Sequence, residues 1–178
     1  MDDSQDRDQL RLEDYFSQET TSFVAEGKNE SDVEVSLKAV GQALFWGCAL
    51  LEFYEERIEE YDEFKRADPG YEILQGFKFA RNRIAHQFLQ LLYITEGAEL
   101  PTSLPFSFFE IRWKNVNELP LDKLGLQKGQ EKIKPFYISH LQGVAVRHTL
   151  MEVLEHTKRL RDWQSNTESA RNTKSLQT

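Results

Sequence analysis

The apolar pattern of residues 31–61 constrains the fold most strongly. Ser31 and Glu34 form a capping box, which predicts the start of a helix. Apolar or small residues then recur up to Tyr61 at alternating steps of four and three, which keeps one stripe of a helix against a partner helix. At about 100° per residue Trp46 lies roughly opposite that stripe, so the middle of this helix should be buried on two sides. A helix of this kind needs more than one neighbouring element.

Another long helix is expected from Asp68 to about Thr95. Asp68 is a favourable N-cap, Pro69 suits the first helical turn, and Gly97 follows the expected end. Apolar residues at helical spacing predict which face of this helix lies in the core. That face comprises Ile73, Phe77, Ala80, Ile84, Phe88 and Leu91.

Two further helices complete the predicted bundle. A shorter one is expected from Leu12 to Phe23, before the polar turn at Gly27. The last is expected from Ser139 to about Gln164, with a broad apolar sector and a basic end that suits a helix C-terminus. The polar segments 1–11 and 165–178 are predicted to be flexible tails.

Residues 98–138 have a different character. They contain four prolines and a β-prone run from Phe106 to Trp113 in which apolar and polar residues alternate. We expect a small β-containing insertion here, with Ile133 to Tyr137 as a candidate return strand. Residues 12–164 are therefore predicted to form one all-α domain. It is an up-and-down bundle of four to five helices, with this insertion between the third and fourth long helices.

Length and charge limit the functions that such a domain can have. The 178 residues suit one domain, and the net charge of −8 argues against binding nucleic acid by broad phosphate neutralisation. Any nucleic-acid chemistry must then depend on a local basic site. The single cysteine, Cys48, allows no intramolecular disulfide, and the acidic start lacks a secretory apolar segment. A cytoplasmic location is expected.

Residues 81–86 read Arg-Asn-Arg-Ile-Ala-His and lie within the expected helix from Asp68. This segment resembles the Arg-x4-6-His signature of HEPN domains, in which the residue after the arginine is polar and often Asn. The resemblance implies a compact helical bundle. It also implies a metal-independent endoribonuclease of a toxin, antiphage or RNA-processing system, which acts as a homodimer with both motifs in one cleft. It implies an RNA substrate, no cofactor, and in toxin systems a cognate antitoxin.

The residue types in the motif suit cleavage of RNA without a metal. Histidine has an ordinary pKa near ~6.5, so His86 can transfer protons at neutral pH as a general acid or base. Arginine stays protonated and presents a fork that matches phosphate oxygens. Arg81 fits the family spacing but lies about 140° from His86 around the helix, whereas Arg83 lies only about 60° away. Either arginine is a candidate phosphate contact, and Asn82, one turn before His86, is a candidate partner of the ring or the phosphate.

Helical geometry also predicts a stripe of side chains opposite the core face of the motif helix. This stripe comprises Phe79, Asn82, His86, Leu89 and Tyr93. Together with Trp46 and Phe53 on the preceding helix, it predicts an isologous dimer interface that contains the active site.

In some toxin relatives the motif continues as His-x-Tyr, and a partner nucleotidyltransferase modifies the tyrosine. The matching residue here is Phe88, so silencing by that modification is not expected.

The main alternative is a non-catalytic helical module that binds a protein partner through the same apolar stripe and the aromatic insertion. The acidic composition favours this alternative, while the motif favours the enzyme. No metal site is predicted, because His140, His148 and His156 are rotated by about 80° at each step and do not share a face. The acidic residues between Glu52 and Glu63 are interpreted as a solvated helix face.

Overall fold

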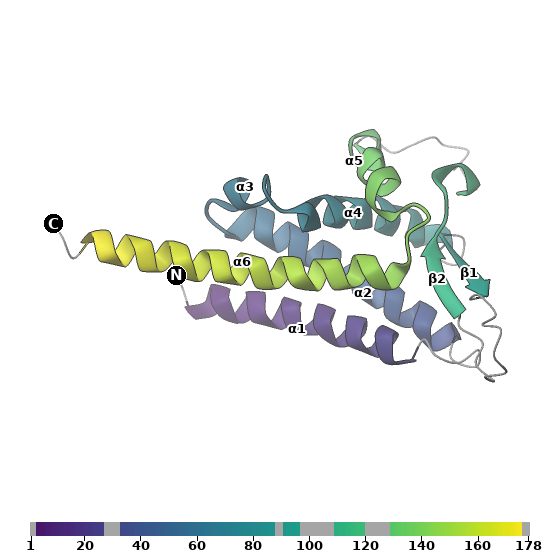
Figure 1. The fold of residues 1–178 in the computed structure, drawn as a ribbon, viewed down its shortest axis with the longest axis horizontal. Helices are drawn as coiled ribbons and strands as arrows, with labels where there is room; N and C mark the ends of the chain where they lie inside the picture. The colour runs from purple at the N-terminus through teal and green to yellow at the C-terminus, as the bar shows by residue number, and fades with distance from the viewer. Residues whose placement is uncertain (1–2, 27–32, 88–90, 97–108, 120–128, 176–178) are drawn as a thin grey trace, which may run out of the picture.

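The computed structural model describes residues 3–26, 33–87, 91–96, 109–119 and 129–175. Four long helices form a bundle in which neighbouring helices in the chain lie side by side (Figure 1). They are α1 (Asp3–Glu26), α2 (Val33–Arg57), α4 (Pro69–Gln87) and α6 (Val146–Ser175), with the short α3 (Tyr61–Phe64) between α2 and α4. The predicted all-α bundle with a small β-containing insertion is confirmed. Among the described residues, none of the helices has the length and apolar character needed to cross a membrane.

A two-stranded antiparallel sheet lies between α4 and α6 in the chain. It pairs β1 (Leu92–Glu96) with β2 (Phe109–Trp113), so that Leu92 lies opposite Trp113 and Glu96 opposite Phe109. The strand that was predicted within 106–113 is confirmed over its second half. The predicted return strand at 133–137 is wrong, because this segment is helical and the partner strand precedes β2.

The motif helix is shorter than predicted, and the insertion is more helical. α4 ends at Gln87, and the segment up to Thr95 that was predicted as helix contains β1 instead. After β2 come the 3₁₀ turn η3 (Val116–Glu118), α5 (Gln130–Phe136) and the π-helical turn η4 (Tyr137–Leu141). The chain then turns at Gly143, where a φ of 73° suits glycine, and α6 begins at Val146 rather than at Ser139.

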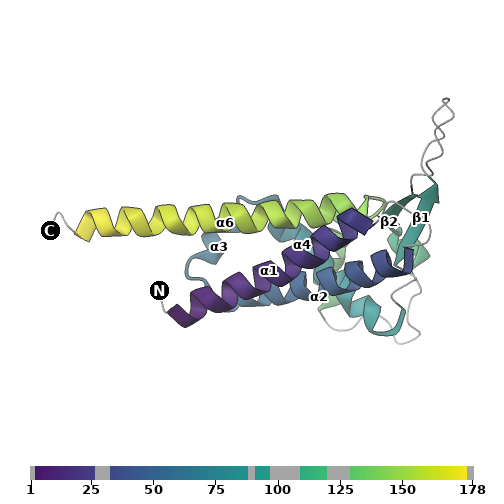
Figure 2. The same cartoon turned by 90° about the horizontal axis from the view of Figure 1, so that it is seen from below.

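The helices at the two ends are longer than predicted. α1 includes most of the segment predicted as an N-terminal tail, and α6 includes most of the C-terminal one. The amide of Gln9 donates hydrogen bonds to Glu13 at 3.0 Å and to Gln164 at 3.1 Å, which ties the first turns of α1 to α6. Beyond this contact the end of α6 extends past the other helices (Figures 1 and 2).

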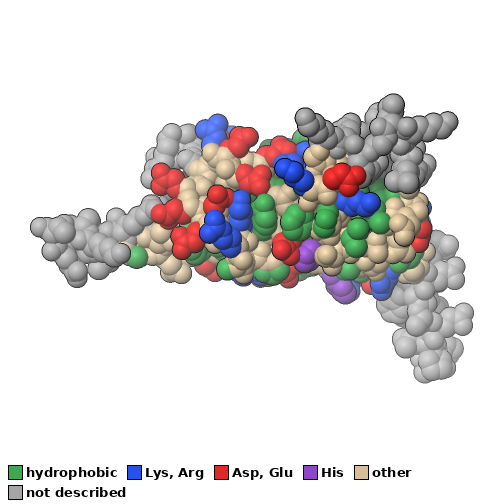
Figure 3. All heavy atoms as spheres, turned by 90° about the horizontal axis from the view of Figure 1, so that it is seen from above, with side chains coloured by type: hydrophobic (Ala, Val, Ile, Leu, Met, Phe, Trp, Pro, Cys, Tyr) green, Lys and Arg blue, Asp and Glu red, His purple; other side chains and the backbone are tan. Residues whose placement is uncertain are grey.

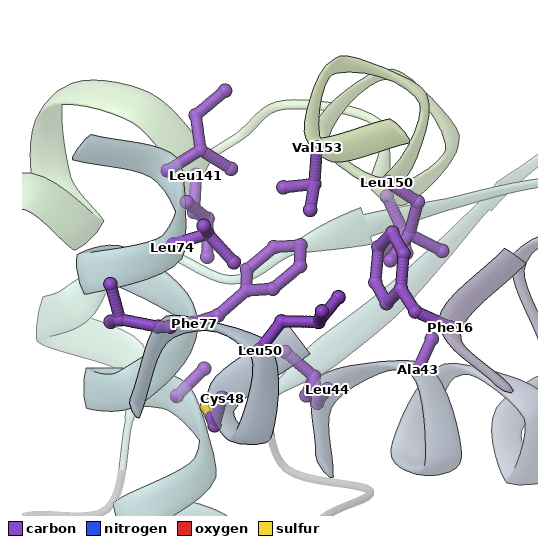
Figure 4. Packing of buried hydrophobic residues seen from close by; sticks show 14 of the residues in the cluster. Phe16, Ala43, Leu44, Cys48, Leu50, Leu74, Phe77, Leu141, Leu150 and Val153 are labelled. Atoms are coloured by element: carbon purple, nitrogen blue, oxygen red, sulfur yellow. The ribbon is translucent and has the colours of Figure 1, made fainter. Parts of the chain in front are cut away.

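Phe77 of α4 lies near the centre of the core, surrounded by apolar side chains from α1, α2, η4 and α6 (Figure 4). Gly47 of α2 allows this packing, because a Cβ there would lie 3.0 Å from the Phe77 ring. Of the predicted core face of the motif helix, Ile73, Phe77, Ala80 and Leu91 are buried as expected, although Leu91 follows the helix end. Ile84 and Phe88 lie outside the side chains that the structure describes.

A buried carboxylate, Glu13, joins three helices. Its Oε1 accepts hydrogen bonds from the hydroxyl of Tyr54 at 3.0 Å and from the amide of Gln9 at 3.0 Å. Its Oε2 lies 3.2 Å from Nε of Arg161 on α6. Burial raises the pKa of Glu13 above its ordinary value, against the opposing effects of Gln9, Arg161 and Tyr54. The ionised carboxylate is therefore a cost to the folded state.

We expect Glu13→Gln to be more stable than wild type at pH 7. The amide keeps an oxygen that accepts from Tyr54 and carries no charge to desolvate. Because the folded-state pKa of Glu13 is raised, its stabilising contribution is complete below the unfolded value near ~4.3 and is lost as the pH rises through the folded value. Urea unfolding from pH 3.5 to 7.5 should show wild type losing stability relative to the variant as the pH rises. Glu19→Gln, on the same helix, is the control, and a variant less stable than wild type at pH 7 contradicts the expectation.

Candidate functional site

The motif segment 81–86 lies in the last turns of α4, which runs antiparallel to α2. Arg81 is half-buried, and its Nη2 lies 3.0 Å from Oε1 of Glu52 on α2. Their side chains are 31% and 47% exposed, so the pair lies at the surface and not in the core. The arginine that helical geometry placed about 140° from His86 thus reaches the outer edge of the α2–α4 contact.

The charges around Arg81 act on a buried thiol of α2. Burial raises the pKa of Cys48 to about 12, while the positive charges of Arg81 and Lys78 act in the opposite direction. The negative charge of Glu52, the partner of Arg81, also raises this pKa. The thiol itself is buried and held neutral, which makes it a core side chain.

The other side of α4 is covered by another segment of the same chain. Phe79, which was predicted at the dimer interface, is 1% exposed, and its ring lies 5.1 Å from that of Tyr137 in η4. That prediction is wrong, because residues 130–141 fold as helical turns against α4. Asn82, one turn further along, is half-buried. The side chains of Arg83 and His86 lie outside those that the structure describes.

The remaining predicted interface residues are divided among different elements. Trp46 and Phe53 are partly buried on α2 and pack against the core. Tyr93 is half-buried on β1, opposite Arg112 of β2, and not on a helix. Leu89 lies outside the described residues.

One exposed aromatic of α2 was missed by the sequence analysis. Phe45 is 55% exposed, and its ring makes an edge contact with that of Trp46 at 5.0 Å. Trp46 stacks on Tyr15 of α1, with ring centroids 4.6 Å apart and planes 25° apart. Phe45 lies next to Trp46 in the sequence and off the apolar stripe of α2, and this position is the sequence signal that could have identified Phe45 as exposed.

A buried polar cluster holds the start of α4 against α6. Asp68 accepts hydrogen bonds from the Gly70 amide at 2.8 Å and from the two ends of the Arg159 guanidinium at 2.5 and 2.9 Å. His156 is fully buried, with Nδ1 2.8 Å from Asp68 and Nε2 3.1 Å from the Tyr61 hydroxyl. Arg159 also donates to Glu152 at 2.8 Å.

This cluster contains a carboxylate, an imidazole and a hydroxyl, as a catalytic relay does, but a substrate cannot reach them. Burial alone would raise the pKa of Asp68, but hydrogen bonds from His156, Arg159 and the Gly70 amide hold it well below its ordinary value. Burial raises the pKa of Tyr61 far above its ordinary value. Since His156 is 0% and Tyr61 2% exposed, no substrate reaches either group. We interpret the cluster as structural: it caps α4 and fixes that helix against α6.

One face of the molecule shows no broad basic patch among the described residues (Figure 3). On the face seen in Figure 3, Lys and Arg side chains are interspersed with Asp and Glu, with hydrophobic side chains between them. Within the part of the chain that the structure describes, no group of three or more His, Cys, Asp or Glu residues could hold a metal ion. Comparison with protein-family models, curated proteins and solved structures finds no match.

Proposed function

We propose that this protein is a metal-independent endoribonuclease of the HEPN type that acts as a homodimer. The observation that carries the proposal is the position of Arg81. It begins the motif, and its guanidinium lies at the surface between α4 and α2 and not inside the bundle. A guanidinium at the surface is available to a phosphate, and the motif places His86 on the next turns of the same helix.

The proposed reaction breaks one bond and forms one. The 2′-oxygen of a ribose attacks the adjacent phosphorus while a general base removes the 2′ proton, and the bond from phosphorus to the 5′-oxygen breaks as a general acid protonates that oxygen. The products are a 2′,3′-cyclic phosphate and a 5′-hydroxyl end. His86 of one protomer is the proposed base and His86 of the other the proposed acid, while Arg81 or Arg83 offsets the charge that develops on the phosphate. Asn82 is proposed to orient the ring or the phosphate.

Two copies are proposed because one motif offers one imidazole. The exposed part of Phe53 and the end of α4 are the proposed contact surfaces, with the two motifs facing one another across a twofold axis. Phe79 is not part of this proposal, since Tyr137 covers it.

The ion pair with Glu52 has a role in the proposal. With no RNA bound, the carboxylate holds the Arg81 side chain in place, and a phosphate has to compete with it. Surface pairs of this kind contribute little to stability, so an exchange of partners is energetically accessible.

We expect wild-type protein to cleave single-stranded RNA in the presence of EDTA and to leave 2′,3′-cyclic phosphate ends. His86→Ala should lower the rate by about 100-fold or more, because general acid–base catalysis contributes factors of ~10² to 10⁴. Arg81→Ala should lower it by about 100-fold through loss of charge stabilisation. Arg147→Ala, an exposed arginine of α6, is the matched control and should cleave like wild type. Mass spectrometry of the ends and the initial rates are the measurements, and equal rates for wild type and His86→Ala would exclude the proposal.

A second candidate is a non-catalytic helical module that binds a protein partner. The ion pair between Arg81 and Glu52 favours it, because a fixed carboxylate already neutralises the guanidinium, and the net charge is −8. This candidate predicts that a freshly purified dimer does not cleave RNA and that its ultraviolet crosslinking to RNA is no stronger than that of Arg81→Ala.

A further inference from the structure

Two exposed aromatic side chains, one on α1 and one on α2, lie on either side of the partly buried Trp46. Phe45 is 55% and Tyr15 45% exposed, and Trp46 lies between them in ring contact with both. The two helices that carry them lie side by side in both ribbon views (Figures 1 and 2). A single exposed apolar residue is ordinary on a protein surface, but two exposed aromatic rings that both contact a third ring between them form a larger apolar surface that suits binding. We call Tyr15, Phe45 and Trp46 the aromatic platform.

The guanidinium of Arg81 lies on the same part of α2 as this platform, where it pairs with a carboxylate at 3.0 Å. Glu52, the partner of Arg81, is two turns after Phe45 on nearly the same side of α2, about 10 Å along the helix axis. At ~3.4 Å per stacked nucleotide this separation corresponds to about three nucleotides.

Exposed aromatic rings beside a basic group are the combination that recognises single-stranded nucleic acid. Bases stack on the rings, and the backbone phosphates meet the cations. We propose that the aromatic platform stacks unpaired bases of the RNA substrate while Arg81 contacts a phosphate about three nucleotides away. The proposal rests on the proposed ribonuclease function and names its substrate class as single-stranded rather than duplex RNA. Base-paired RNA offers its bases only to one another, so it does not use this surface.

The test measures binding to the full-length protein in the His86→Ala background, where cleavage does not remove the probe. The probe is a fluorescent ten-nucleotide oligouridine, compared with a duplex RNA of the same length. Because stacking on an aromatic ring contributes ~1 to 3 kcal/mol per base, Phe45→Ala should weaken oligouridine binding by about 10-fold or more. Phe45→Trp should retain it. Met151→Ala, another exposed apolar side chain (42%) but on α6, is the control and should bind like the parent protein.

Each outcome decides between defined alternatives. Oligouridine binding by Phe45→Ala that equals the parent, or equal loss in Met151→Ala, overturns the platform. If Phe45→Ala changes the elution volume from dimer to monomer in size-exclusion chromatography, the surface is a contact between two copies, and the RNA platform is overturned as well. If wild-type protein does not cleave RNA but Phe45→Ala still loses binding, the platform stands and the ribonuclease proposal fails.

Discussion

Asp68→Ala is expected to lower the free energy of unfolding by about 3 kcal/mol. A buried polar group that loses its hydrogen-bond partner costs ~1 to 3 kcal/mol, and the loss of an N-cap adds ~1 kcal/mol. Here the truncation leaves the buried ring of His156 without its acceptor and the Gly70 amide without its cap, while Arg159, which is 41% exposed, keeps Glu152 as a partner. Urea denaturation followed by circular dichroism measures the change.

Two further variants separate the contributions of charge and cap. Asp68→Asn keeps an oxygen for the Gly70 amide and should recover roughly the ~1 kcal/mol of the cap. Asp62→Ala, at a surface aspartate that pairs with Lys65, should leave stability close to that of wild type. A result in which Asp68→Ala is as stable as Asp62→Ala would show that the buried cluster does not hold the fold together.

The cluster also fixes the pH dependence of this effect. The folded-state pKa of Asp68 is held below its unfolded value near ~3.9, so its stabilising contribution is complete above that value. The contribution is lost as the pH falls through the lower folded value. The difference in stability between wild type and Asp68→Asn should therefore be constant from pH 5 to 7 and shrink below about pH 4.

Gly70→Ala is expected to be the other strongly destabilising substitution, at about 3 kcal/mol. A Cβ at this position would lie 2.3 Å from the Cβ of His156 and 2.6 Å from its Cγ. Real contacts of this kind do not occur below 3.0 Å, so α4 and α6 would have to move apart. Overpacking of a closed core costs ~1 to 3 kcal/mol, and this contact is at the upper end of that range because both atoms belong to fixed parts of two helices.

The control for Gly70→Ala is Pro69→Ala, at the exposed residue next to it. Proline at the first helical position contributes only a modest preference, so this variant should lose less than ~1 kcal/mol. Thermal unfolding of the three proteins should separate Gly70→Ala clearly from the other two. Equal melting temperatures for the two variants would mean that the contact between Gly70 and His156 does not limit how closely the helices pack.

Local patterns were sufficient to predict the helical bundle, because burial repeats at the helical period. The buried face of α4, including Ile73 and Phe77, follows from spacing alone. The Asp68 cap was likewise visible from the residue types at the helix start, and the Gly70 amide confirms it. These features depend on residues close together in the chain.

The errors concern contacts between distant segments. The apolar run after Gln87 continues the helical spacing, but residues 92–96 pair with residues 109–113, and long-range pairing overrides local preference. Phe79 was assigned to an outward stripe from its angle on the helix alone, but the helical turns that replace the predicted return strand cover it through Tyr137. Nothing local could bring His156 to Asp68, 88 residues earlier.

The platform and the Arg81 site illustrate the same limit. The residue types in the motif indicated a chemistry, but the partner of Arg81 is Glu52, 29 residues away on another helix. The stacking of Trp46 on Tyr15 depends on how α1 lies against α2, which the spacing within either helix does not specify.

Asp68 contacts His156 and Arg159 but lies 88 and 91 residues before them in the sequence, and this separation along the chain affects the order of folding during synthesis. A nascent chain that has emerged only as far as residue 145 already contains the whole motif helix but none of α6. Its Asp68 then has neither the imidazole nor the guanidinium that anchors it in the finished protein. The motif helix therefore takes its final orientation only after the part of α6 up to Arg159 has left the ribosome, so translation itself delays the packing of that helix.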